Sequence, residues 1–220
     1  MKTLSRIILN LTPITGVLFA FSAHAVTLNF DCITFNDTED CGIGESQIQV
    51  DVADPGSSFI DFTFTNIGDD QSTISEIYFD DNGFLENISA INSSTGVSFD
   101  EGARPPDLPG GMAVGFEAST GLLASADNPA PANGVNADPL DFVTITFALM
   151  TGISFEDALS ALGTDLRIGI HVINFGSGGS ESFVTPAPVP LPAGVWLMGS
   201  ALLSLVTLGR RKKRCCLAYT

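Results

Sequence analysis

Clusters of aspartate and asparagine are the residues of this chain whose chemistry is easiest to name. Calcium is bound in proteins by about six to eight oxygen ligands, which neighbouring carboxylates, amides and loop carbonyls supply. Three stretches, none with the EF-hand spacing, therefore contain candidate calcium ligands, and calcium is the only cofactor that the sequence suggests. The candidates are Asp69, Asp70, Asp80, Asp81, Asp127, Asp138 and Asp141. Because Asp and Asn also form plain turns, a turn is the simpler interpretation of each stretch.

Catalytic groups are scarce. Outside the first 25 residues His171 is the only histidine, and its apolar neighbours Ile170 and Val172 indicate a strand position near a core. No Gly-x-Ser-x-Gly motif accompanies it, and residues 26–184 contain no lysine for Schiff-base chemistry. Paired carboxylates are the remaining route, because glycoside hydrolysis needs only two of them. We therefore expect no enzymatic activity, and a hydrolase acting on polysaccharide ranks third among the possible functions.

Two cysteines, Cys32 and Cys41, lie nine positions apart around the acidic stretch 33–40. A disulfide between them would close a short loop and add about 2–3 kcal/mol of stability in the chain-entropy model. A metal site is the alternative, but two cysteines with no histidine nearby make a poor zinc site. We predict the disulfide.

The first 25 residues have the pattern of a secretion signal. Lys2 and Arg6 precede a largely apolar stretch, and Ala23 and Ala25 are the small residues expected before a cleavage site. An N-terminal membrane anchor is less favoured, because the apolar stretch is short and interrupted by polar residues and a proline. The pattern predicts export through the Sec translocon, cleavage by signal peptidase before Val26, and a compartment in which disulfides persist.

The stretch 26–184 is strongly acidic. It holds all 25 carboxylates of the chain but only two cations, Arg104 and Arg167, so its formal net charge is −23. A surface of this charge repels phosphate backbones, which makes nucleic acid an unsuitable partner. The simplest role of the carboxylates is to keep an apolar β-domain in solution.

The elements that position these residues follow a period of two. Alternation of apolar and polar residues predicts antiparallel strands over 46–52, 57–66, 72–81, 141–149, 165–175 and 181–184. One helix is expected over 154–163, with Ser154 as its N-cap and Asp157 completing a capping box. The Pro- and Asn-rich stretch 124–139 predicts a long loop. We therefore predict an all-β fold: an antiparallel β-sandwich or jelly-roll-like ectodomain over 26–184, with one short helix.

The C-terminal region reads VPLPAGVWLMGSALLSLVTLGRRKKR over 189–214, after a Pro-rich stalk at 185–188 and before a tail at 215–220 that contains Cys215 and Cys216. Residues 193–208 carry no charge and, with their flanks, are long enough to cross a bilayer. A run of cations follows and predicts that this end of the segment lies in the cytoplasm. The segment is therefore expected to be a transmembrane helix, with residues 26–184, the body of the protein, outside. The run consists of Arg210, Arg211, Lys212, Lys213 and Arg214.

This region resembles the PEP-CTERM family of sorting signals in its VPLPA variant. The resemblance implies that the recognition motif is Val189, Pro190, Leu191, Pro192 and Ala193, followed by the helix and the basic stop. It further implies processing by an exosortase in the inner membrane of a Gram-negative bacterium that makes exopolysaccharide and biofilm. Two features depart from the family pattern: Pro-Leu-Pro replaces Pro-Glu-Pro, and the tail after the cations is long.

These observations give three functional expectations. The first is a membrane-anchored precursor that becomes a non-enzymatic protein of the cell surface or extracellular matrix, with a structural role in biofilm. Its partners would be exopolysaccharide or other surface proteins. The second is a calcium-dependent carbohydrate-binding or adhesion module, and the third is the hydrolase.

Overall fold

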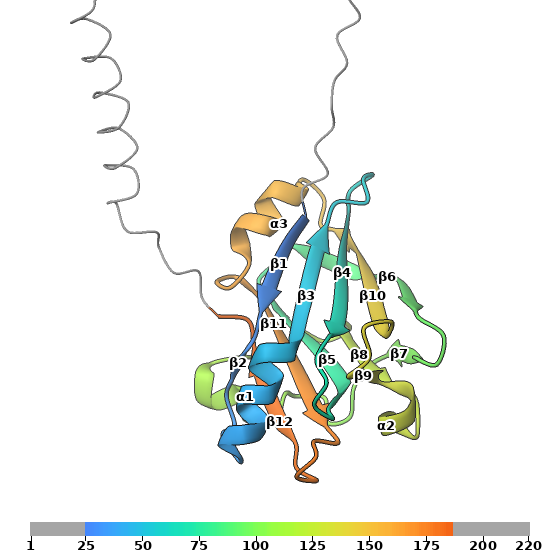
Figure 1. Ribbon diagram of the computed structural model, residues 1–220. Coiled ribbons are helices and arrows are strands. Elements are labelled where there is room, and N and C mark those ends of the chain that lie inside the picture. Colours follow the sequence, from blue (N-terminus) through green and yellow to red (C-terminus); the bar gives the residue numbers. More distant parts are fainter. Residues whose placement is uncertain (1–24, 187–220) are drawn as a thin grey trace, which may run out of the picture.

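A computed structural model describes residues 25–186 (Figure 1). Most of the predicted signal peptide with Ala23, the sorting motif, the membrane helix and the basic run lie outside these residues. Between residues 25 and 186, no helix combines the length and the apolar character that a membrane span requires.

Five strands form the first sheet, in the order β1 (Ala25–Asn29), β3 (Ile48–Ala53), β4 (Phe59–Asn66), β10 (Phe142–Leu149) and β6 (Leu85–Ser93). All neighbours are antiparallel. The alternation in β4 buries Ile60, Phe62 and Phe64, whereas Asp61 and Thr63 lie on the outer face. The strands predicted over 46–52, 57–66 and 141–149 are confirmed.

Seven strands form the second sheet. Six follow the order β2 (Asp31–Cys32), β12 (Glu181–Val184), β11 (Leu166–Ile173), β5 (Thr73–Asp81), β8 (Leu123–Ala126) and β7 (Phe99–Glu101), and β9 (Val135–Asn136) pairs with β5. Every pair is antiparallel. The strands predicted over 72–81, 165–175 and 181–184 are confirmed.

The two sheets lie face to face (Figure 1). Their inner faces pack against each other through phenylalanine rings. Phe79 of the seven-stranded sheet contacts Phe62 and Phe147 of the five-stranded sheet, with ring centroids 5.0 and 4.6 Å apart in edge-to-face arrangements. Such aromatic pairs add stability beyond the area that they bury. The predicted antiparallel sandwich is therefore confirmed.

The predicted helix is present as α3 (Phe155–Ala161), and its capping box forms between Ser154 and Asp157. The expectation of a single helix is wrong, because α1 (Thr38–Gln47) and α2 (Ala130–Asn133) are also present, together with the 3₁₀ turn η1 (Gly111–Val114). The stretch 124–139 is likewise not one loop, since α2, β9 and part of β8 fall within it.

Helix α1 begins inside the acidic stretch 33–40, at Thr38, and continues to Gln47. Its N-cap Asp37 accepts hydrogen bonds from the amides of Glu39 and Asp40, which fixes where the helix begins. Its buried positions recur at helical spacing, but they carry polar or small residues: Asp40, Cys41, Gly44 and Gln47. Because the buried stripe is not apolar, hydrophobic periodicity could not reveal this helix.

Candidate functional site

The outer face of the seven-stranded sheet is partly covered by residues 102–122, which we call the covering segment. Tyr78 on β5 and Val184 on β12 point outward from the sheet and pack with Leu108 and Phe116 of this segment. All four side chains are buried. The protein therefore has a second, smaller core behind the sheet, and the covering segment is a fixed part of the fold.

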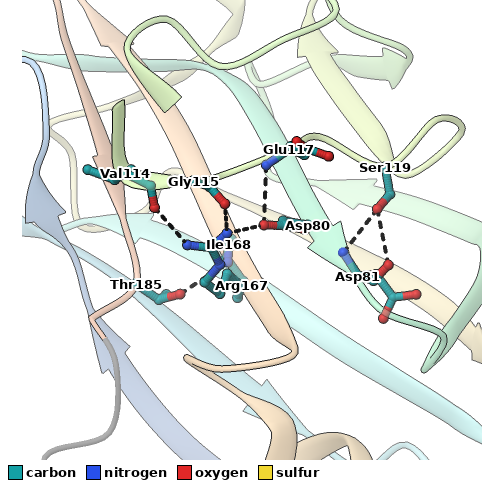
Figure 2. Close-up of polar contacts among 9 residues, drawn as sticks. All are labelled: Asp80, Asp81, Val114, Gly115, Glu117, Ser119, Arg167, Ile168 and Thr185. Carbon is teal, nitrogen blue, oxygen red and sulfur yellow. Dashed lines mark hydrogen bonds and ion pairs between the residues drawn. The ribbon is translucent and has the colours of Figure 1, made fainter. Parts of the chain in front are cut away.

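Arg167 anchors the covering segment to the sheet (Figure 2). Its guanidinium forms an ion pair with Asp80 and donates hydrogen bonds to the carbonyl of Gly115 and, at 3.2 Å, to the carbonyl of Val114. It also lies over the ring of Phe116, 5.4 Å from the centroid. A planar group with several donors suits this multiple contact. One of the two cations of the body is thus used to hold this segment.

Further contacts fix the segment along its length. Ser119 receives a hydrogen bond from the amide of Asp81 at 2.9 Å and donates to the carbonyl of the same residue (Figure 2). The hydroxyl of Tyr78 donates to the carbonyl of Pro105 at 3.1 Å. Burial, then the nearby charges of Glu76 and Asp107, raise the pKa of Tyr78, so the phenol stays protonated as this donor.

An open acidic cleft of about 540 Å³ lies at the start of the covering segment, whose residues 102–104 form part of its lining. Its floor is a row of outward-facing residues on adjacent strands, since Glu76 on β5 is paired with Ser125 on β8 and Ser125 with Asp100 on β7. The remaining polar or charged side chains of the lining are Glu101, Arg104, Asp127 and Asn128. The cleft thus combines four carboxylates with one guanidinium, one hydroxyl and one amide.

Two carboxylates of this cleft have different environments. Burial raises the pKa of Glu76, opposed in part by a hydrogen bond from Ser75, whereas Asp100 is exposed. Two strand spacings place their Cα atoms about 10 Å apart on one face. A carboxyl with a raised pKa on the same face as a second carboxyl is an arrangement that acid–base hydrolysis can use, and oxygen-rich clefts of this kind also bind cations.

The candidate calcium ligands are distributed over the molecule, and only Asp127 lines the cleft. Asp80 is paired with Arg167. Asp81 accepts hydrogen bonds from the amides of residues 83–85, and Asp138 accepts one from the amide of Leu140, as in ordinary turns. Asp141 accepts hydrogen bonds from the backbone amide and the side-chain amide of Asn136. No three of the seven side chains come within 4.8 Å of one another in residues 25–186.

His171 lies on β11 between Glu76 of β5 and Ser182 of β12. Its Nδ1 is 3.2 Å from the hydroxyl of Ser182, which is fully buried. Burial lowers the pKa of His171, and the charge of Glu181 opposes that change. A buried serine is closed to substrate, so this contact has the character of a structural histidine.

The structure joins Cys32 of β2 to Cys41 of α1 in a disulfide, with Cα atoms 5.5 Å apart, as predicted. Glu181 of β12 lies against it, with a carboxylate oxygen 3.8 Å from the sulfur of Cys32. This carboxylate is buried and accepts hydrogen bonds from the amides of Asn36 and Asp37, at 3.1 and 2.6 Å, and from the hydroxyl of Thr34.

Sequence reasoning missed Glu181. Its neighbours along the chain predict only a short strand, and its partners lie more than 140 residues away. No local pattern marks such a contact.

Comparisons with protein-family models, with curated proteins and with solved structures find no match to this chain.

Proposed function

We propose that this chain is the precursor of an exported, non-enzymatic β-sandwich of the bacterial cell surface or extracellular matrix, which an exosortase processes at the motif beginning with Val189. The mature body would contribute to a biofilm or exopolysaccharide envelope. The resemblance of 189–214 to the VPLPA sorting signals is the main support from the sequence.

The observation that carries the proposal is where the sandwich begins and ends. The first strand begins at Ala25 and the last ends at Val184, five residues before the motif. Cleavage after Ala25 removes only the terminal residue of β1, and cleavage near Val189 leaves β12 whole. Both predicted cuts are therefore compatible with an intact body, which is what a sorting mechanism requires.

Intact-mass spectrometry of the protein purified from its own cells tests this proposal. We expect the mass of a chain that begins at Val26 and lacks residues 196–214. Trp196 is the only tryptophan of the chain, so the mature protein should also lack tryptophan fluorescence. Pro192→Ala should leave the C-terminal segment attached, whereas Pro188→Ala, outside the motif, should be processed normally. A native protein that retains Trp196 through Arg214 would contradict the proposal.

A second candidate function, calcium-dependent carbohydrate binding or adhesion, is favoured by the acidic cleft. If the cleft binds calcium, millimolar Ca²⁺ should raise the melting temperature of the wild type, and Asp100→Asn should reduce the rise. Asp54→Asn is the matched control, because Asp54 lies outside the cleft lining. An unchanged melting temperature in Ca²⁺ would rule this function out.

The hydrolase alternative depends on Glu76 and Asp100 of the same cleft. It predicts release of reducing ends from a neutral polysaccharide, and loss of this release in Glu76→Gln. Absence of any release by the wild type would favour the non-enzymatic proposal.

A further inference from the structure

Three elements bring Cys32, Cys41 and Glu181 together at one end of the sandwich. Strand β2 supplies Cys32, helix α1 supplies Cys41, and strand β12 supplies Glu181. One sulfur or oxygen atom from each lies within 4.8 Å of the other two. Within residues 25–186 no other group of three cysteine, histidine or acidic side chains is as close. All three are buried, with exposed fractions of 4%, 4% and 1%.

Glu181 is a buried carboxylate without a cationic side chain against it. The one ion pair of the described residues joins Arg167 to Asp80 instead. The hydrogen bonds from Thr34, Asn36 and Asp37 hold the carboxylate in place beside the sulfurs. One oxygen of this carboxylate, held by these donors, also faces the sulfur of Cys32, so it is positioned as a ligand for a cation that the sulfurs would bind as well.

We propose that these three residues form a zinc-type metal site when the disulfide is reduced. A dithiol, which is oxidised to a disulfide, or a phosphine, which is oxidised to a phosphine oxide with the oxygen of water, reduces the Cys32–Cys41 bond by two electrons and, with two protons, produces two thiols. Binding of one divalent ion then releases both protons, leaving two thiolates and one carboxylate as ligands, with water in the fourth position.

The distance between the sulfur of Cys32 and the oxygen of Glu181 fits this ligand set. Zn–S bonds of about 2.3 Å and Zn–O bonds of about 2.0 Å in a tetrahedron separate a sulfur from an oxygen by about 3.5 Å. The carboxylate oxygen of Glu181 and the sulfur of Cys32 are 3.8 Å apart. Glu181 supplies the third protein ligand that a two-cysteine site lacks, and the disulfide and the metal exclude each other because they use the same sulfurs.

Cobalt titration tests the site, because Co²⁺ bound to thiolates absorbs in the near ultraviolet. The experiment uses the full chain in detergent with Cys215→Ser and Cys216→Ser, so that only Cys32 and Cys41 supply thiols. We expect one equivalent of Co²⁺ to bind to the reduced protein with this absorption, displaced by Zn²⁺, and none to bind to the sulfurs of the oxidised protein.

Glu181→Gln separates this site from binding by two thiols alone. It should weaken Co²⁺ binding on the order of 10- to 100-fold. Glu39→Gln is the matched control, because Glu39 is an exposed carboxylate of the same helix α1 that does not belong to the group of three. Its affinity for Co²⁺ should equal that of the parent.

The parent protein of these tests is the chain with Cys215→Ser and Cys216→Ser. Its melting temperature in the reduced state distinguishes a folded metal site from the thiols of an unfolded chain. Zn²⁺ should raise that temperature, because a ligand bound to the native state stabilises it. Binding without such a rise, or equal affinity in Glu181→Gln and the parent, would overturn the proposal.

Discussion

Arg167 and Asp80 face each other as direct partners on β11 and β5, and their ion pair fastens the covering segment to the seven-stranded sheet. The side chains are 22% and 14% exposed, so the pair is largely withdrawn from water. The same guanidinium reaches two carbonyls and the ring of Phe116. The side chain of Arg167 therefore makes an ion pair, two hydrogen bonds to backbone carbonyls and an aromatic contact at the same time.

Replacing Arg167 by alanine should lower the free energy of unfolding by about 2–4 kcal/mol, because it leaves the carboxylate of Asp80 and two carbonyls without their donor. Lysine should recover less than half of the loss, since a single ammonium cannot reproduce the fork of donors. Urea unfolding measures both. The control is Arg104→Ala at the other, exposed cation of the body, which should change stability by less than about 0.5 kcal/mol. Equal effects at the two arginines would show that the anchor contributes no stability.

Gly169 allows the covering segment to approach β11. A Cβ at this position would lie 2.7 Å from a methyl of Leu108 and 2.9 Å from the ring of Phe116. Gly169→Ala should therefore cost about 1–3 kcal/mol of unfolding free energy. Gly176→Ala, where a Cβ would meet open space, is the control in the same urea experiment. An alanine tolerated equally at both positions would mean that the segment is not tightly packed.

Two glycines of α1 should respond in opposite directions to alanine. At Gly42 a Cβ would have no neighbour within 4 Å, so Gly42→Ala should stabilise the protein by about 0.5–1 kcal/mol through helix propensity. At Gly44 the Cβ would overlap the ring of Phe183, so Gly44→Ala should be destabilising. Thermal unfolding compares them directly, and a stabilising Gly44→Ala would contradict the packing of α1 on β12.

His171 should make the protein less stable as the pH falls below about 6.5. Burial lowers the pKa of His171 in the folded protein, so the unfolded state takes up the proton first. Its contribution is complete above the unfolded pKa and is lost as the pH falls from that value to the lower folded pKa, by at most about 1.4 kcal/mol per pH unit. His171→Gln should lose less stability than the wild type between about pH 7.5 and about pH 5.5. Equal losses in urea unfolding would exclude this role.

Six of the twelve strands of residues 25–186 were predicted, and among these β3, β4 and β10 could be recognised because only one face of each is buried; β1, β2 and β6 to β9 were not predicted. Through the middle of β4 the buried Ile60, Phe62 and Phe64 alternate with the polar Asp61, Thr63 and Thr65, so the residue types themselves repeat with a period of two. Helix α3 could be predicted for a similar reason, since Ser154 and Asp157 mark its start. Helix α1 was not predicted because its buried side carries Asp40, Gly44 and Gln47, whose burial depends on partners in distant segments.

Gln47 illustrates the dependence on distant partners. Its side chain donates to Asn66, to Ser72 and to the carbonyl of Asp70, and accepts the amide of Asp70. The acidic cleft was not predicted for the same reason. Asp100 and Glu76 meet only through the pairing of β7, β8 and β5, and neither drew attention as part of a cluster along the chain.

The position of β12 has a mechanical consequence. This last strand is not at an edge, because β2 pairs with one side of it and β11 with the other. β2 is itself linked to α1 by the disulfide. A tension applied to the chain after Pro186 would therefore have to break hydrogen bonds on both sides of β12 before the sandwich begins to unravel. A body pulled from its C-terminal end should yield at a higher force than one whose last strand is a free edge.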